Sequence, residues 1–291
     1  MRGLNQILVA EALEDAADAP IADLFDLVVG TSIGGCGALF VHRFGNDAVA
    51  ASRRAIEALR SRCFAPKRVG RFLTEGHTCV DERRELVREL CGNDRLRASR
   101  TSGARGEDRL RAGPRAAAVT TTRDETGRPV PYLLRTYRAK PTAPYAGTCD
   151  ATLADAIAAT SAAPTFFPRS ALPGADLVDG GVGFNDPSLV ALAEARSLGR
   201  PVALVSLGTG GSGETTVDRA AATACAEVGV AYHRLQPPLE GNVGPAEARE
   251  DVLGRMEDAT RAWLREPAQQ RALRDAAAAV APVREECCDR D

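Results

Sequence analysis

The stretch that decides the fold is FDLVVGTSIGG, residues 25–35. Its first half is a short apolar run, which is typical of a buried strand in a parallel sheet. The second half contains GTSIG at 30–34, and the small residues from about Cys36 to His42 predict a helix directly after it. A strand, a tight glycine turn and a helix in this order indicate an α/β fold with Ser32 at the turn.

The pentapeptide 30–34 fits the pattern G-x-S-x-G, in which each position has a physical role. A sharp turn holds the Ser32 hydroxyl at the sheet edge in a strained backbone conformation. Gly30 and Gly34 let neighbouring backbone pass close by, and the helix that starts at Ile33 supplies positive potential for an oxyanion. The alternative is a glycine turn that merely packs a helix on a strand, and the flanking elements weigh against it.

Strands alternate with helices along the rest of the chain, which predicts a mostly parallel sheet sandwiched by helices. The expected helices are 4–16, 47–63, 81–91, 152–160 and 187–197, with a helical pattern from 217 onward. The expected strands after the first are 116–122, 131–138, 176–178 and 202–207. The stretch 93–115, rich in Arg, Gly and Ser, predicts a surface loop.

The composition argues against several classes of protein. The 291 residues include 37 basic and 39 acidic side chains, for a formal net charge of −2, so nothing indicates nucleic-acid binding. The eight cysteines form no C-x-x-C pair, which argues against a structural zinc site. No apolar run approaches the ~20 residues that span a bilayer. We therefore expect a cytoplasmic protein or one bound peripherally to a membrane.

A serine nucleophile needs a base, and the usual base is histidine. The chain has three histidines, and each is expected to be an ordinary surface or core residue. His42 lies about three helical turns past Ser32, His77 lies in a loop after Gly76, and His233 has no turn or glycine signal beside it. A second candidate base is Asp179, which follows a short strand and precedes Gly180-Gly181. Taken alone, that segment also fits a tight turn in which the carboxylate bonds its own backbone.

Several motifs together resemble the patatin-like phospholipase family, which includes calcium-independent phospholipases and plant lipid acyl hydrolases. The matching segments occur in the family's order and lie at 26–35, 159–168, 179–182, 185–187 and 206–210. The similarity runs from about Arg2 to Gly211, with a weaker match at 232–239. It implies a catalytic domain at 1–212 and a helical C-terminal extension at 213–291 packed on it, whose tail is expected to be loose.

The resemblance also implies a chemistry. Ser32 would be the nucleophile and Asp179 its sole partner in a Ser-Asp dyad, supported by the turn at Gly180 and Gly181. Acyl lipids, phospholipids among them, would be the substrate, cleaved through an acyl-serine intermediate without cofactor or metal. Because a free aspartate is a weak base, burial beside Val178 and Phe184 is expected to raise the pKa of Asp179.

The chain departs from the family at its start. Family members begin with a strand that leads into a glycine-rich loop of the type D-G-G-G-x-R-G, whose N–H groups resemble an oxyanion hole. Only Arg2 and Gly3 match the end of that loop, so the first strand is expected to be missing. Together with Gly30, Ile33 and Gly34 they are the candidate oxyanion and elbow residues. Two interpretations remain open: a start inside a longer protein, or a real loss of the hole.

Two other functions compete with lipid acyl hydrolysis. A non-catalytic patatin-like fold that binds lipid or a partner would suit the missing loop, although Ser32 and Asp179 are retained. An α/β-hydrolase esterase would use a triad of Ser32, Asp179 and His233, which occur in the required chain order. The seven arginines of 95–115 indicate either attraction to a membrane or lipid-droplet surface or a solvated insertion, and the second is favoured.

Overall fold

The computed structural model describes residues 1–64, 78–97, 113–172, 174–211, 213–239, 241, 243–244 and 246–281. Its helices are α1 (Gly3–Ala17), α2 (Ile21–Leu24), α3 (Ile33–Phe44), η1 (Gly45–Asp47), α4 (Ala48–Cys63), α6 (Thr78–Cys91), α7 (Leu153–Thr160), η2 (Gly180–Val182), α8 (Ser188–Leu198), α9 (Thr216–Glu227), α10 (Glu250–Leu264) and α11 (Pro267–Val280). Its strands are β1 (Leu27–Thr31), β2 (Arg115–Arg123), β3 (Pro129–Arg135), β4 (Gly147–Thr148), β5 (Ser170–Leu172), β6 (Ala175–Asp179), β7 (Ala203–Leu207) and β8 (Ala231–Leu235). His77, most of the arginine-rich loop and the tail from 282 lie outside the described residues.

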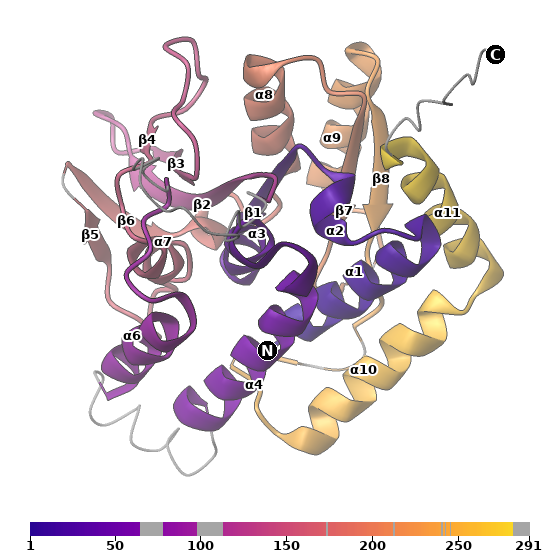
Figure 1. Cartoon of the computed structure of the whole chain (residues 1–291), viewed down its shortest axis with the longest axis horizontal. Helices are drawn as coiled ribbons and strands as arrows, with labels where there is room; N and C mark the ends of the chain where they lie inside the picture. The colour runs from indigo at the N-terminus through magenta and orange to yellow at the C-terminus, as the bar shows by residue number, and fades with distance from the viewer. Residues whose placement is uncertain are drawn as a thin grey trace, which may run out of the picture.

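Two sheets flanked by helices form the centre of the molecule (Figure 1). The larger sheet has the order β4-β3-β2-β6-β5, with β1 also paired to β2, and the smaller one is β7-β8. The pairs β1-β2, β3-β4 and β7-β8 are parallel, while β2-β3, β2-β6 and β5-β6 are antiparallel. The predicted α/β arrangement of a sheet between helices is confirmed.

Strand β2 is buried on both faces. Its side chains point alternately to the two faces of the sheet, and each face is covered by a different set of helices. Ala116 and Ala118 belong to a core that includes buried residues of α3 and α7. Ala117 and Val119 belong to a second core together with Val190 of α8. A strand covered on both sides reads as a continuous apolar run, which is why residues 116–119 carry only Ala and Val.

Strands β1 and β6 share one edge of β2 and meet end to end. β1 runs parallel to β2 up to the pair of Thr31 with Val119. β6 runs antiparallel along the same edge and ends at the pair of Asp179 with Thr120. Since β3 occupies the opposite edge of β2 over these residues, the carboxyl ends of β1 and β6 face each other. The residue after β1 is Ser32, so this topology directs Ser32 and Asp179 to one point.

Between β1 and β7 there is an open slot. Within the described part of the chain, β1 pairs with β2 alone and β7 with β8 alone. A cavity of about 1160 Å³ is lined by Leu27–Thr31 on one side and by Ala203–Leu207 on the other. The Gln6 side chain of α1 donates to the carbonyl of Leu207 at 2.9 Å from inside this slot. Among the described residues, β1 and β7 therefore each have one edge that faces the slot without a partner strand.

Strand β8 corrects one expectation, because the region after 212 is not wholly helical. Residues 231–235 pair with β7 along its full length, so a boundary at 212 separates two partners of one sheet. A five-residue strand is stabilised mainly by pairing with its neighbour, and its own residues give only a weak strand signal. The helix-like composition around it therefore led to a helical prediction for the whole region. Helices α10 and α11 do follow, and Leu264 and Leu273 pack with Leu8 and Leu13 of α1.

Candidate active site

Ser32 occupies a strained turn between β1 and α3. Its backbone has φ 56° and ψ −120°, a conformation that non-glycine residues rarely adopt. A Cβ at Gly30 would lie 2.0 Å from the carbonyl oxygen of Gly34, so only glycine lets these two backbone segments cross. A Cβ at Gly35 would lie 2.6 Å from Thr160 Oγ1. The glycines thus let the turn close tightly, and the predicted elbow geometry is confirmed.

The Ser32 hydroxyl donates a hydrogen bond to Asp179, with Oγ and Oδ2 separated by 2.7 Å. The two residues are 147 positions apart, so the expected proximity is confirmed by the fold and not by local sequence. The other carboxylate oxygen, Oδ1, accepts from the N–H of Gly181 at 2.7 Å. A Cβ at Gly180 would come within 2.4 Å of the Val119 carbonyl oxygen, so this turn also needs its glycine. Asp179 is thereby held by two hydrogen bonds.

Burial raises the pKa of the Asp179 carboxyl above its ordinary value. The hydrogen bonds from Ser32 and from the Gly181 N–H, and the nearby positive charge of Arg83, act in the opposite direction without cancelling the effect of burial. Asp179 is 5% exposed, which accounts for the large desolvation. A carboxylate with a raised pKa binds a proton more readily than a free aspartate, so it is a better general base.

Comparison with known proteins agrees with this geometry. The sequence profile of the family described as Patatin-like phospholipase matches residues 1–192, the part of the chain that contains both Ser32 and Asp179.

This chain belongs to the patatin-like phospholipase family. It is 39% identical over 105 residues to calcium-independent phospholipase A2-gamma of Mus musculus, which is 34% of this chain and 13% of that protein. The protein of the same name from Homo sapiens is 41% identical over 103 residues, covering 33% of this chain and 13% of the human protein. The chain therefore matches only a small part of the length of these relatives.

Thr160 supports the Ser32 turn and was not among the residues predicted from the sequence. Its hydroxyl accepts from the backbone N–H of Ser32 at 3.0 Å and donates to the carbonyl of Val119 at 2.7 Å. The side chain is fully buried at the end of α7. Thr160 therefore fixes the serine backbone to β2, and its place in the matched segment 159–168 was the available signal. The two aromatics of that segment, Phe166 and Phe167, line the cavity.

The start of α1 packs directly against the elbow of this patatin-like domain. A Cβ at Gly3 would lie 2.5 Å from Cγ1 of Ile33, and Arg2 and Gly3 line the same cavity as Ser32. The first N–H groups of a helix have no partner within it, which applies to Ile33 and Gly34 at the start of α3. The predicted residues Arg2, Gly3, Gly30, Ile33 and Gly34 thus line the same cavity as Ser32.

The histidines give no support to a triad in the described part of the chain. His42 is near the end of α3, where its Nδ1 lies 2.9 Å from the carbonyl oxygen of Pro114. His233 pairs with Val205 in the middle of β8 and is not among the residues that line the cavity with Ser32. His77 lies outside the described residues.

An apolar wall lies beside Ser32. Ile33 packs with a cluster of half-buried and buried side chains around the cavity, including Ile56, Phe64 and Phe167. Arg83 closes this wall: its guanidinium lies 3.9 Å from the centre of the Phe167 ring and donates to the carbonyl and hydroxyl of Ser161. A cavity lined in this way can accommodate an apolar group beside Ser32.

Two kinds of feature are absent from the described residues. No helix there combines the length and apolar character that crossing a bilayer requires. No group of three or more His, Cys, Asp and Glu side chains in those residues is arranged to hold a metal ion.

Proposed function

We propose that this chain hydrolyses carboxylic ester bonds of acyl lipids, with Ser32 as nucleophile and Asp179 as general base. The single observation that carries the proposal is the 2.7 Å hydrogen bond between Ser32 Oγ and Asp179 Oδ2 at a strained strand-to-helix turn. Membership of a phospholipase family supports a lipid substrate. The apolar cavity beside the dyad supports a fatty acyl group.

The reaction would proceed in two halves. Ser32 Oγ attacks the ester carbonyl carbon while its proton passes to Asp179 Oδ2. The tetrahedral intermediate then collapses, and the leaving alcohol takes that proton as the acyl-serine forms. Water attacks the acyl-serine and gives a proton to Asp179, which returns it to Ser32 as the carboxylic acid leaves. The N–H groups of Ile33 and Gly34 lie on the elbow side where the oxyanion would develop.

Labelling with a fluorophosphonate probe tests the proposal directly. An activated serine should be modified at Ser32, identified by peptide mass spectrometry, and Asp179→Asn should slow the reaction. A matched control is Ser197→Ala, because Ser197 lies near the end of α8, where its hydroxyl donates to the Glu194 carbonyl, and it is not among the residues that line the cavity. Absence of labelling at Ser32 in the folded chain would favour the competing view of a non-catalytic lipid- or partner-binding protein.

The raised pKa of Asp179 predicts the pH dependence. A general base acts only when ionised, so kcat/KM should fall as the pH drops through the pKa of Asp179. Because burial raises that pKa, the midpoint of the acid limb should lie above about 4, the value of a free aspartate. The measurement is kcat/KM for a soluble ester between pH 4 and 9. An acid limb that disappears in His233→Ala would instead identify a histidine base and contradict the dyad.

An exposed apolar residue beside the dyad predicts how lipid surfaces are contacted. Val182, in the turn after Asp179, is 52% exposed and lines the mouth of the cavity. We propose that it contacts the lipid surface, so Val182→Asp should lower turnover on phospholipid vesicles several-fold and leave a soluble ester unaffected. The control is Val228→Asp, since Val228 is 36% exposed at the end of α9 but is not among the residues that line the cavity. Equal effects of both variants on vesicles would contradict this assignment.

A further inference from the structure

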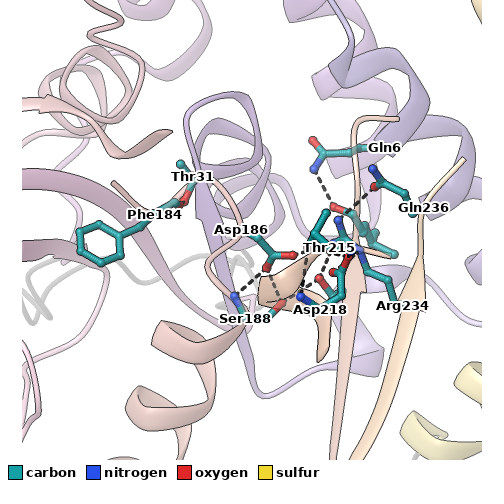
Figure 2. A network of polar contacts seen from close by, with 11 residues as sticks. Gln6, Thr31, Phe184, Asp186, Ser188, Thr215, Asp218, Arg234 and Gln236 are labelled. Atoms are coloured by element: carbon teal, nitrogen blue, oxygen red, sulfur yellow. Dashed lines mark hydrogen bonds and ion pairs between the residues drawn. The ribbon is translucent and has the colours of Figure 1, made fainter. Parts of the chain in front are cut away.

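Arg234 is the hub of a polar network, because its guanidinium on β8 contacts residues of β7, of α9 and of the loop after the Asp179 turn. From β8, its Nη1 donates to the hydroxyl of Ser206 on β7 at 2.6 Å, and its Nη2 donates to Gln236 Oε1 at 3.0 Å. Its Nε lies 3.0 Å from Oδ1 of Asp218 on α9. Its Nη1 also lies 3.3 Å from Oδ2 of Asp186, in the loop that follows the Asp179 turn. Figure 2 shows these side chains converging.

The hub is shielded from water, which makes its charges matter. The Asp218 side chain is 4% exposed, that of Asp186 11% and that of Arg234 20%. One guanidinium thus forms ion pairs with a buried carboxylate, Asp218, and a largely buried one, Asp186, a role that suits the broad, planar charge of arginine better than the point charge of lysine. Nη1 and Nη2 already donate to Ser206 and Gln236, and Asp186 and Asp218 already supply the opposite charge, so Arg234 is a poor candidate for binding a substrate anion and a good one for holding structure.

The loop at 180–187 is tied at both ends. Near its start, the Thr121 hydroxyl donates to the carbonyl of Gly180 at 3.3 Å, and the Thr31 hydroxyl of β1 donates to that of Phe184 at 2.7 Å. At its end, Asp186 meets Arg234. The first tie comes from the larger sheet and the second from the smaller one, so the loop bridges the two sheets (Figure 2).

Asp186 also forms hydrogen bonds that link the hub to α8. Its Oδ1 accepts from the backbone N–H of Ser188 at 2.9 Å and from the Ser188 hydroxyl at 2.5 Å. That hydroxyl also lies 2.9 Å from the hydroxyl of Ser206, which Arg234 contacts. Asp186 therefore joins the first residue of α8 and the guanidinium at once. Loss of Arg234 would leave Asp186 and Asp218 as buried carboxylates without a cation between them.

We propose that Arg234 is a positioning residue of the active site: through Asp186 it holds the 180–187 loop so that the Asp179 carboxylate and the Gly181 N–H stay aligned with Ser32. The inference rests on the proposed function, because alignment matters only if Ser32 and Asp179 react. It assigns a role in the chemistry to a residue on β8, the strand that belongs to the other sheet.

The test compares Arg234→Gln, Arg234→Lys and Asp186→Asn in the 291-residue chain. The rate of fluorophosphonate labelling at Ser32, followed over probe concentration, separates binding of the probe from the chemical step. We expect Arg234→Gln and Asp186→Asn each to lower the limiting rate about 10- to 100-fold with little change in apparent affinity, and the double variant to be no slower. The limiting rate of Arg234→Lys should be intermediate, because lysine keeps the positive charge but loses the planar, multiple-donor geometry of the guanidinium.

Two further readouts separate positioning from general stability. The acid limb of the labelling rate should move to lower pH in Arg234→Gln, because a loosened loop hydrates Asp179. Amide hydrogen exchange should rise in 180–188 and stay unchanged in β2 and β3. The control is Arg169→Gln, which removes an exposed arginine paired with Asp176 and should change none of these.

The measured labelling rate, acid limb and hydrogen exchange together either support or overturn the positioning role of Arg234. A lower melting temperature with an unchanged labelling rate and acid limb would overturn it and leave Arg234 a purely structural residue. If Arg234→Gln does not fold, Asp186→Asn and Arg234→Lys carry the same comparison. If the unmodified chain is not labelled at all, the proposed function fails, while exchange in 180–188 still decides whether Arg234 holds the loop: unchanged exchange overturns that step as well.

Discussion

Ser32→Ala should reduce ester hydrolysis by about a thousandfold or more, and Asp179→Asn should do nearly the same. Ser32 supplies the attacking oxygen, and no other described hydroxyl donates to the Asp179 carboxylate. The amide introduced by Asp179→Asn would keep the size of the side chain and its bond to the Gly181 N–H but could not accept the Ser32 proton. Because both residues act in one step, the double variant should be no slower than Ser32→Ala.

Steady-state kcat/KM on a short-chain p-nitrophenyl ester provides the measurement, with circular dichroism and thermal melts to confirm folding. His233→Ala is the matched control, since His233 lies on β8 away from the cavity lining and should keep most of the activity. If His233→Ala were as damaging as Ser32→Ala, a Ser-Asp-His triad would replace the dyad. Activity that persists in Ser32→Ala would place the nucleophile elsewhere.

Filling the slot between β1 and β7 should raise both turnover and solubility. The Arg115 N–H donates to the Asp26 carbonyl, so Val28 and Gly30 face β2, while Leu27 and Val29 direct their backbone groups into the slot. Unpaired strand edges of this kind promote aggregation, and a strand inserted there would find hydrogen-bond partners on both sides.

Strand β7 presents the other edge of the slot. The Ala231 N–H donates to the Val202 carbonyl, so Ala203, Val205 and Leu207 face away from β8 and toward the cavity. The Gln6 side chain takes the Leu207 carbonyl, as expected for a strand edge that lacks a partner. Gln6 also lies near Gly34, just after β1, so the carboxyl ends of both strands point to the start of α1.

A strand followed by Asp-Gly-Gly-Gly-x, placed ahead of Arg2, is expected to run parallel to both edges and to end beside Ser32. Its glycine N–H groups would add oxyanion donors, and one such donor is worth about 100- to 1000-fold in turnover. We therefore expect a gain of that order in Ser32-dependent kcat/KM, with less aggregation in light scattering. A control graft with the same strand but Ala in place of the glycines should recover solubility without the gain in rate. Equal turnover by the chain without any graft would show that its oxyanion donors are already sufficient.

The sequence by itself determined the features that depend on neighbouring residues. The strand-turn-helix at 25–44 follows from an apolar run, two glycines that permit close backbone contact, and a helix of small residues. The positive φ of Ser32 is a consequence of that local turn. The Asp179-Gly180-Gly181 turn was likewise visible, and the order of the motifs pointed to the family before any contact was known.

Only the tertiary structure decided how these pieces meet. Ser32 and Asp179 come within 2.7 Å because β1 and β6 run in opposite senses along one edge of β2, a register that no local pattern encodes. Thr160 became a site residue only when α7 packed on β2. Strand β8 and its Arg234 were missed because a short strand gains its stability from pairing, and buried charges find their partners through burial. Long-range contacts of this kind depend on the packing of whole elements, whereas turns and periodicities are set by residues a few positions apart.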